Sequence, residues 1–555
     1  MNSKKEIPGL AREYFSHISS RYPVMCLSDE FYFFPRAKKA REFLYLLDDL
    51  DREKINQSTS FVNKLYLRLQ NIPTDDAGLE TQIDIALLKQ STATFLREFR
   101  DLRVWQVNPA LYLKIILLGV EQLRAISFSS PCRAQEHLIS RIKQIPRLLS
   151  QARQNLSKVP GGYLKTSREV ANASITYFNN LHFIGVKTRG LGEFDASLRK
   201  AKESLQVFNR FLMKKSPSSA FFIKDKDLLY STLKDSFSCQ RSLDEIFQIA
   251  STQLRNTKRE LIALAKEIDH KKTWQEILYD HNITNFDSAE VLRLYSGQIE
   301  KLKDFTRSLD ILPAIQTQRV LVKETPLYLR PLRASASYSC PITKNLKEPA
   351  FFYVTVGPPE NSKTIINSPK RKRTSFYSSV HNEYIFVAAH ETYPGHHLLD
   401  SIRRKLKNPI RQQIESPLFY EGWASYAERL IDELGYIKSP QLKLLGLKRQ
   451  AWRAVRAMLD AGIRINKVKL KDIGNQLMYL GYAPGLVKSM LRHYLLTPGY
   501  QLCYTIGKFE IEKLKKRFSP VISSQDFHTI VLNSGQIPFK LLEKKLEAFV
   551  CKKNS

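Results

Sequence analysis

Apolar residues recur three and four positions apart along most of this 555-residue chain, a spacing that places them on one face of an α-helix. Residues 43–50 are one example, with leucines that follow this spacing. The same spacing predicts helices over residues 78–100, 110–127, 133–156, 194–213, 226–234, 243–268, 287–308, 440–465 and 470–492. Prolines and glycines separate these segments, which follow no fixed repeat period. The pattern therefore predicts a mainly α protein.

Residues 318–357 follow a different pattern, of short β-branched and aromatic runs bounded by prolines. The runs cover residues 319–322, 327–329 and 351–356. Such runs are typical of strands, so this part predicts a small β-sheet or set of hairpins within the helical body. The edge of such a sheet could pair with an extended peptide, or the strands could simply fill a gap between helices.

No shift in composition marks a linker between domains. We divide the chain near residue 310, into a helical N-terminal lobe (residues 1–310) and a C-terminal lobe (residues 311–555). The two lobes could also form one continuous domain. The candidate chemistry described below falls in the C-terminal lobe.

The composition is that of an ordinary globular protein, with 43% hydrophobic and 25% charged residues. No apolar stretch reaches the ~18 residues expected of a membrane span, and the richest, residues 111–120, contains Lys114. The N-terminal residues lack the apolar core of a signal peptide. The six cysteines are far apart and include no Cys-x-x-Cys pair, which favours a reducing compartment. We therefore expect a cytoplasmic protein that does not act at a membrane, and we expect Cys132 and Cys503 to be buried free thiols.

The chain carries a formal net charge of +33, from 87 Lys and Arg residues against 54 Asp and Glu residues. A basic surface attracts anions such as acidic peptides and nucleic acid. The densest basic run, residues 370–373, is typical of a surface loop and would also suit a phosphate-binding patch. No recognised nucleic-acid-binding motif accompanies it, so nucleic acid is the less favoured partner.

Three of the eleven histidines lie within eight positions, at His390, His396 and His397, and Glu391 follows the first of them. A zinc peptidase needs two neutral imidazoles on the metal, an adjacent carboxylate as general base, and an open coordination position for water. The segment supplies these residue types. A helix end with ordinary surface or core histidines is the alternative interpretation.

The spacing of these histidines differs from the usual His-Glu-x-x-His. On a straight helix, six residues rise ~9 Å and turn the second imidazole ~120° away, and seven residues rise ~10.5 Å. Neither spacing lets two imidazoles reach one zinc ion at ~2.1 Å. The helix must therefore break between His390 and His396. Pro394 and Gly395 supply the break, because proline disrupts the helical hydrogen bond and glycine permits an unusual backbone path.

Glu421 is a candidate third ligand, because one class of zinc peptidase takes this ligand from the helix that follows the histidines. Residues 419–430 begin such a helix. Glu428 lies seven residues later on the same face and could hold a ligating histidine through its second ring nitrogen. The alternative for Glu421 is a carboxylate near a helix start, where the helix dipole favours it.

Residues 390–397 together with residues 421–428 resemble the family catalogued as domain of unknown function 885. Residues 498–507 and 532–538 carry further motifs that are similar to this family. Its members are largely α-helical and are regarded as zinc peptidases, distantly similar to the angiotensin-converting-enzyme and thermostable-carboxypeptidase folds. The resemblance implies a large helical metallopeptidase-like body with a central cleft.

The resemblance also implies roles for individual residues. The zinc ligands it implies are His390, His396 and Glu421. His397 would be a neighbour of the ligand His396, and Glu391 would be the general base. Tyr504 would be a phenol that stabilises the oxyanion of the transition state, or alternatively a core tyrosine.

Two positions depart from the family pattern. Tyr500 follows Pro498-Gly499, where the family often has Gln. The other departure lies in the segment Asp-x-Gly-x-His, which in the family follows the Glu421 helix. Here Asp460-Ala461-Gly462-Ile463 is followed by Arg464. Arg464 could bind a substrate carboxylate through two hydrogen bonds.

The departure at Arg464 also motivates a second hypothesis, a helical binding protein with altered catalysis and a basic, nucleic-acid-binding surface. A third is a zinc hydrolase of a non-peptide amide. The preferred hypothesis is a zinc metallopeptidase acting on peptides, with acidic peptides favoured by the charge.

Overall fold

A computed structural model describes the chain over residues 3–74, 77–126, 131–182, 190–219, 225–280, 288–331, 333, 336–340, 345–356 and 382–554. The predicted mainly α fold with one small sheet is confirmed. The basic run at residues 370–373 lies outside the described residues.

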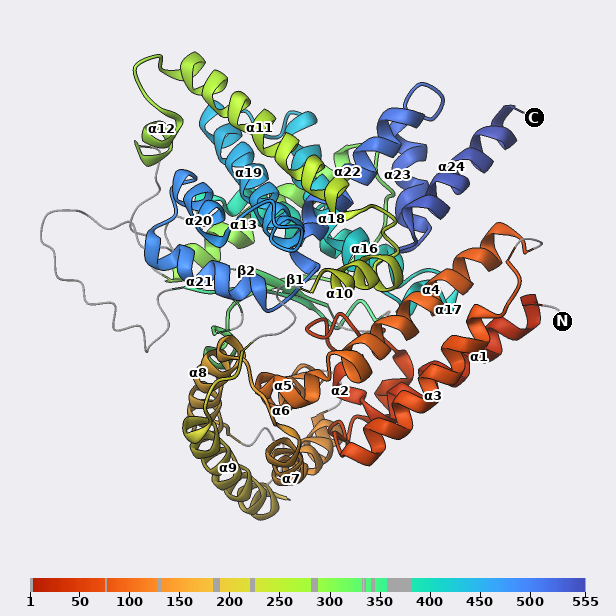
Figure 1. Cartoon of the computed structure of the whole chain (residues 1–555), viewed down its shortest axis with the longest axis vertical. Helices are drawn as coiled ribbons and strands as arrows, with labels where there is room; N and C mark the ends of the chain where they lie inside the picture. Colours follow the sequence, from red (N-terminus) through yellow and green to blue (C-terminus); the bar gives the residue numbers. More distant parts are fainter. Residues whose placement is uncertain are drawn as a thin grey trace, which may run out of the picture.

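The first helices of the chain lie together on one side of the molecule (Figure 1). They are α1 (Ser3–Arg21), α2 (Pro23–Cys26), α3 (Arg52–Gln70), α4 (Leu79–Leu96), α5 (Val104–Val107), α6 (Pro109–Ile126), α7 (Pro131–Asn155), α8 (Gly161–Asn179) and α9 (Leu191–Lys214). Proline begins α6 and α7, where its missing N–H would have no partner within the helix. Shorter 3₁₀ and π segments are η1 (Lys38–Phe43), η2 (Arg97–Asp101) and η4 (Thr232–Ser236).

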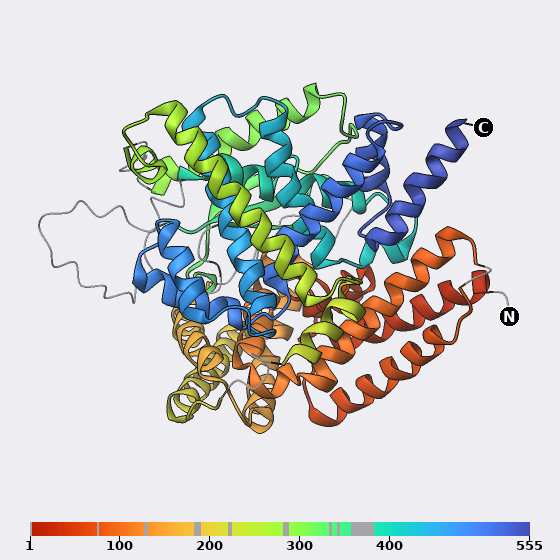
Figure 2. The ribbon, with the colours of Figure 1, turned by 45° about the horizontal axis from the view of Figure 1, so that its top comes forward.

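The remaining helices form the other side, around the candidate site. Four of them precede residue 310: α10 (Lys226–Ser231), α11 (Leu243–Ile268), α12 (Trp274–Asp280) and α13 (Ser288–Ser308). The others are α15 (Tyr384–Glu391), α16 (His396–Arg403), α17 (Pro409–Gln413), α18 (Pro417–Glu433), α19 (Pro440–Gly462), α20 (Leu470–Tyr479), α21 (Pro484–Leu495), α22 (Tyr500–Phe518), α23 (Ser524–Asn533) and α24 (Phe539–Asn554). Figure 2 shows α11 lying along α19, with which it makes extensive contact.

The division near residue 310 stays a prediction. α11 and α13 precede that residue, yet they pack against α19 and α15, which follow it. One cluster of buried apolar side chains extends from Ile7 to Leu546. The buried core is therefore shared by both parts of the chain.

Three strands form a mixed sheet: β1 (Val320–Glu324), β2 (Ala336–Ser339) and β3 (Ala350–Val354). The order is β1-β3-β2, with β1 parallel and β2 antiparallel to the central strand. Phe352 pairs with Val322 on one side and with Tyr338 on the other. The strand predicted at residues 327–329 is wrong. These residues form the 3₁₀ turn η5 (Leu327–Leu329), in which Leu329 N donates to Pro326 O.

Two of the predicted helices are also wrong in detail. Residues 44–50 are not helical, because the backbone N–H groups of Leu47 and Leu50 donate to Gln144 and Gln151 of α7 instead. The segment predicted at 470–492 is two helices, α20 and α21. Gly481, with φ of +89°, separates them.

The six cysteines form no disulfide, and Cys132, predicted to be buried, is exposed. Among the helices that the structure describes, none is long and apolar enough to span a bilayer. Two helix contacts place the candidate site: α15 packs on α18, and α18 packs on α22.

Candidate metal centre

The predicted helix break between the first two histidines is confirmed. α15 ends at Glu391 and α16 begins at His396. A Cβ atom on Gly395 would lie 1.9 Å from His390 O, so only glycine fits this turn. The turn brings the ring of His396 back to His390, with ring centroids 4.7 Å apart.

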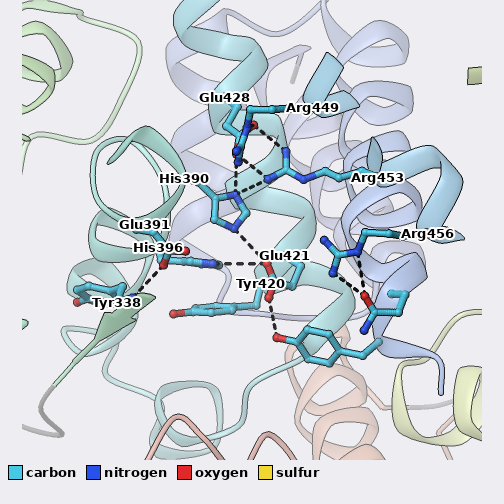
Figure 3. Close-up of polar contacts among 12 residues, drawn as sticks. Tyr338, His390, Glu391, His396, Tyr420, Glu421, Glu428, Arg449, Arg453 and Arg456 are labelled. Carbon is cyan, nitrogen blue, oxygen red and sulfur yellow. Dashed lines mark hydrogen bonds and ion pairs between the residues drawn. The ribbon is translucent and has the colours of Figure 1, made fainter. Parts of the chain in front are cut away.

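Glu421 of α18 completes a buried group of three candidate ligands (Figure 3). Its Oε2 atom lies 3.3 Å from His390 Nε2 and 3.6 Å from His396 Nε2. One ligand atom from each of the three residues lies within 4.8 Å of the others. The side chains come from three different helices, so this convergence depends on how α15, α16 and α18 pack.

The chemistry of this group fits a metal ion. Glu421 Oε2 is fully buried, yet it accepts no well-directed hydrogen bond within the described structure. Burial alone would raise the pKa of the Glu421 carboxyl, but its contacts with His390 and His396 hold that pKa well below the usual range. One carboxylate and two imidazoles are the donor set of many zinc sites. The buried group could therefore hold a metal ion.

Glu428 lies at the Nδ1 side of the His390 ring, where a carboxylate can fix the orientation of a metal-binding imidazole. Its Oε1 atom is 3.1 Å from His390 Nδ1. Arg449 and Arg453 each donate two hydrogen bonds to the Glu428 carboxylate, over 2.6–3.1 Å. Burial alone would raise the pKa of Glu428, but these arginines and His390 hold it well below its usual range. Binding of a metal by Nε2 requires the ring proton on Nδ1, where this carboxylate can accept it.

The second histidine is held by an aromatic ring instead. The ring of Tyr420 stacks on His396 at 3.8 Å and 14°. The Tyr420 hydroxyl donates to Asp400 Oδ2 at 3.2 Å, which fixes the position of the ring. His396 Nδ1 is buried and has no hydrogen-bond partner among the described residues.

His397 lies outside the candidate ligand group. Its Nδ1 is 2.9 Å from the Tyr338 hydroxyl, and its Nε2 is 3.1 Å from Gln318 O. Burial lowers the pKa of His397 to about 3, so the ring is neutral at physiological pH. Both ring nitrogens are therefore occupied by protein partners.

Glu391 is half-buried and reaches the same cavity as the three candidate ligands. Its Oε2 accepts a hydrogen bond from the backbone N–H of Tyr338 at 3.0 Å. Tyr338 belongs to the edge strand β2, so the small sheet positions this carboxylate. One oxygen is held by the strand, and the other is available to a ligand in the cavity.

Two tyrosines of α22 line the cavity beside Glu421. The Tyr500 hydroxyl donates to Glu421 Oε1 at 2.6 Å. The Tyr504 ring lies nearly parallel to that of His390, at 6.1 Å and 20°. Burial and nearby Glu421 raise the pKa of Tyr504, which keeps the phenol protonated. Tyr504 was expected near the site from the sequence, whereas Tyr500 was noted only as a departure from the family pattern.

These side chains line a cavity of about 900 Å³ that both parts of the chain enclose. Asp29, Glu30 and Glu169 come from the N-terminal part and Ala336 from the sheet. Three arginines of α19 also line it: Arg449, Arg453 and Arg456. The sequence did not mark them as site residues, although their spacing of four and three residues within the predicted helix at 440–465 places them on one face.

Arg464 does not reach this cavity. Its Nη1 atom donates to Asp460 O at 2.6 Å and to Asp460 Oδ1 at 3.2 Å. Asp460 in turn accepts hydrogen bonds from the backbone N–H groups of Gly499 and Gln501, each at 3.0 Å. In this position, Arg464 supports the start of α22, and the expectation that it binds a substrate carboxylate receives no support.

Comparisons with known proteins agree with the resemblance seen in the sequence. The chain is similar in fold to the crystal structure of a "putative lipoprotein" from Colwellia psychrerythraea, with a TM-score of 0.77 and 15% identity over 99% of each chain. It is also similar to a "putative lipoprotein of unknown function" from Shewanella oneidensis, with a TM-score of 0.66 and 16% identity over 91% of this chain and 94% of that one. At such identities the likeness shows a shared fold alone.

No curated protein matches the sequence. A family model described as "Bacterial protein of unknown function (DUF885)" matches residues 41–546, which is nearly the whole chain. The chain therefore belongs to the DUF885 family of bacterial proteins.

Proposed function

We propose that this chain is a zinc metallopeptidase. The observation that carries the proposal is the buried Glu421 Oε2 atom, which faces His390 Nε2 and His396 Nε2 without a well-directed hydrogen bond. A buried carboxylate oxygen without a well-directed hydrogen bond is costly, and a cation between these three atoms would remove that cost. His390, His396 and Glu421 would hold the ion.

Zinc, when bound there, would supply a Lewis acid that polarises a peptide carbonyl and makes water more acidic. Glu391 takes one proton from the attacking water, whose oxygen bonds to the carbonyl carbon. As the C–N bond breaks, Glu391 returns that proton to the leaving amine. The Tyr504 hydroxyl, a protonated donor on the cavity wall, stabilises the negative charge that develops on the carbonyl oxygen.

The edge strand β2 supports a peptide as the substrate. Ala336, Ser337 and Tyr338 line the cavity, and the sheet order leaves one side of β2 without a described neighbouring strand. An extended peptide can pair with such an edge and so lie across Glu391. The net charge of +33 favours peptides of acidic character.

A non-peptide amide would use the same chemistry, and hydrolysis assays on both classes separate the two. The alternative of a nucleic-acid-binding protein rests on the net charge and on the departure at Arg464, which pairs with Asp460. A cytoplasmic location also stays a prediction. The two structural relatives carry the word lipoprotein in their descriptions, so cell fractionation should include the envelope.

The test combines metal content with peptide cleavage. We expect one zinc ion per chain in the purified protein and in Glu391→Gln, measured by plasma mass spectrometry. The wild type should cleave a peptide pool in a zinc-dependent manner, and Glu391→Gln should lose at least about 100-fold, because general acid–base catalysis contributes at least this factor. The proposal would be contradicted if the protein bound no zinc even after zinc was supplied, or if Glu391→Gln kept full activity.

A further inference from the structure

Arg456 is a buried cation on the cavity wall, and no carboxylate among the described residues lies within ion-pair distance of it. It differs in this from the other arginines of α19, since Arg449 and Arg453 both pair with Glu428. Arg456 is 6% exposed. Its Nε and Nη2 atoms both donate to the neutral amide oxygen of Gln501, at 2.9 and 2.6 Å.

Aromatic rings hold the guanidinium of Arg456 in place. Its central carbon lies 4.1 Å from the ring centroid of Tyr504, 4.5 Å from that of Trp452 and 5.1 Å from that of Tyr494. Cation–π contacts of this kind stabilise the cation but leave its charge unneutralised. A fixed, planar guanidinium beside a cavity is suited to a carboxylate, which it can bind through two parallel hydrogen bonds.

The position of Arg456 relative to the candidate metal ligands is set by Tyr504. One face of this ring is turned to His390, at 6.1 Å and 20°, and the ring also contacts Arg456. The central carbon of Arg456 therefore lies no more than about 10 Å from the ring centroid of the candidate ligand His390. An extended peptide advances about 3.3–3.6 Å per residue, so one or two residues together with the bound carboxylate can span a distance of this size.

We propose that Arg456 binds the terminal α-carboxylate of the peptide, so that the enzyme removes one or two residues from the C-terminal end. This inference rests on the proposed function and adds the substrate class to it. One C–N bond breaks, the hydroxyl of water joins the acyl carbon, and the proton goes to the new amine. A peptide with an amidated C-terminus keeps every other contact but loses the charged partner of Arg456.

The first experiment compares two pools of N-acetylated hexapeptides, randomised at their last two positions, with a free carboxylate or a carboxamide at the C-terminus. Mass spectrometry of the products identifies the bond cleaved. For the wild type, we expect loss of one or two C-terminal residues, with kcat/KM about 10–100-fold higher for the free acid, the usual size of a charge-assisted contact.

Variants of Arg456 test the assignment to this residue. Arg456→Gln should lower kcat/KM for the free acid about 10–100-fold and leave the amide unchanged, so that the preference disappears. Arg456→Lys should retain part of the preference for the free acid. The matched control is Arg259→Gln, which removes an exposed arginine of α11 and should keep the wild-type preference. Equal losses on both pools in Arg456→Gln would mean that Arg456 only supports Tyr504 and Gln501, and would overturn the proposal.

A binding measurement separates failure of this inference from failure of the proposed function. Glu391→Gln, loaded with zinc, is incubated with each pool, and the retained peptides are counted by mass spectrometry. The free acid should be retained about 10-fold or more above the amide. Loss of this difference in the double variant Glu391→Gln/Arg456→Gln would support the carboxylate site even without hydrolysis. Hydrolysis by the wild type with equal retention and equal rates for both pools leaves the peptidase intact and refutes the role of Arg456.

Discussion

Gly422 of α18 and Gly507 of α22 lie against each other, backbone to backbone. A Cβ atom on Gly422 would lie 2.5 Å from the carbonyl carbon of Gly507, and one on Gly507 would lie 1.9 Å from Leu418 O. No other residue type allows the two helices to come this close. Because Glu421 is next to Gly422, this crossing brings its carboxylate to the tyrosines of α22.

The first prediction concerns this crossing. Gly507→Ala should push α22 away from α18, because the new methyl group meets backbone rather than a mobile side chain. We expect the free energy of unfolding to fall by about 3 kcal/mol, at the upper end of the usual cost of overpacking. Zinc affinity should fall too, since the contact of Tyr500 with Glu421 depends on the same crossing.

The matched control is Gly297→Ala. Gly297 lies within α13, and a Cβ there would meet nothing within 4 Å. This change should stabilise the protein by about 0.5–1 kcal/mol, because alanine favours helix. Thermal unfolding and zinc titration of both variants check the prediction, which is wrong if Gly507→Ala behaves like the wild type.

The second prediction concerns Glu428, which orients His390. Glu428→Gln should weaken zinc binding about 10–100-fold, as loss of a carboxylate behind a ligating histidine usually does. Competition with a chromophoric chelator measures this affinity. The control is Glu433→Gln on the same helix, which removes the exposed ion pairs with Arg429 and Lys515 and should cost at most about 1 kcal/mol of stability. Unchanged zinc affinity in Glu428→Gln would show that this carboxylate does not support zinc binding by His390.

The third prediction separates the two adjacent histidines by metal removal. Chelation should lower the melting temperature of the wild type, and zinc should restore it, since a ligand at 100 times its Kd stabilises by about 2.7 kcal/mol. His396→Ala should show no such response. His397→Phe should keep the response, although the whole curve shifts down because Gln318 O and the Tyr338 hydroxyl lose their partner. A zinc response in His396→Ala, or its loss in His397→Phe, would reverse the assignment.

The fourth prediction concerns acid stability and His528. This ring is fully buried between Tyr426 and Ile311 O. Burial, and secondly the charge of Lys515, lower the pKa of His528 from 6.5 to about 4. In the unfolded chain the group therefore binds a proton at a higher pH than in the folded one. The stability that neutral His528 contributes is fully present above the unfolded pKa and is lost as the pH drops toward the folded pKa.

Between pH 7.5 and 5 this group should account for about 2 kcal/mol of lost stability, at ~1.36 kcal/mol per pH unit. His528→Gln keeps a donor and an acceptor but cannot titrate, so its stability should depend less on pH. Urea unfolding at the two pH values measures the difference. His270→Gln, at an exposed histidine, serves as the control. Parallel losses in the wild type and His528→Gln would assign the acid sensitivity to other groups.

Much of the fold follows from local spacing. Apolar residues three and four positions apart predict α11, α13 and α19, because a helix of any sequence brings such positions to one face. The failures have tertiary causes. Residues 44–50 follow the same spacing, but Gln144 and Gln151 of α7 bind their backbone N–H groups and hold them out of a helix.

For the candidate site, the sequence by itself determined the residues that are close in the chain. His390, Glu391, the break at Pro394 and Gly395, and the return of His396 follow from spacing and backbone chemistry, because six residues of straight helix cannot bring two imidazoles to one ion. Glu421 could be named as a candidate because a second helix begins where a further ligand was expected.

Only the tertiary structure decided the rest. Which arginine faces the cavity depends on how α19 rotates against α11 and α22, and that packing places Arg456 in the cavity and turns Arg464 to Asp460. The hydrogen bond from Tyr338 to Glu391 joins residues from a strand and a helix. Such contacts follow from the packing of the whole core, and no local pattern of residues encodes them.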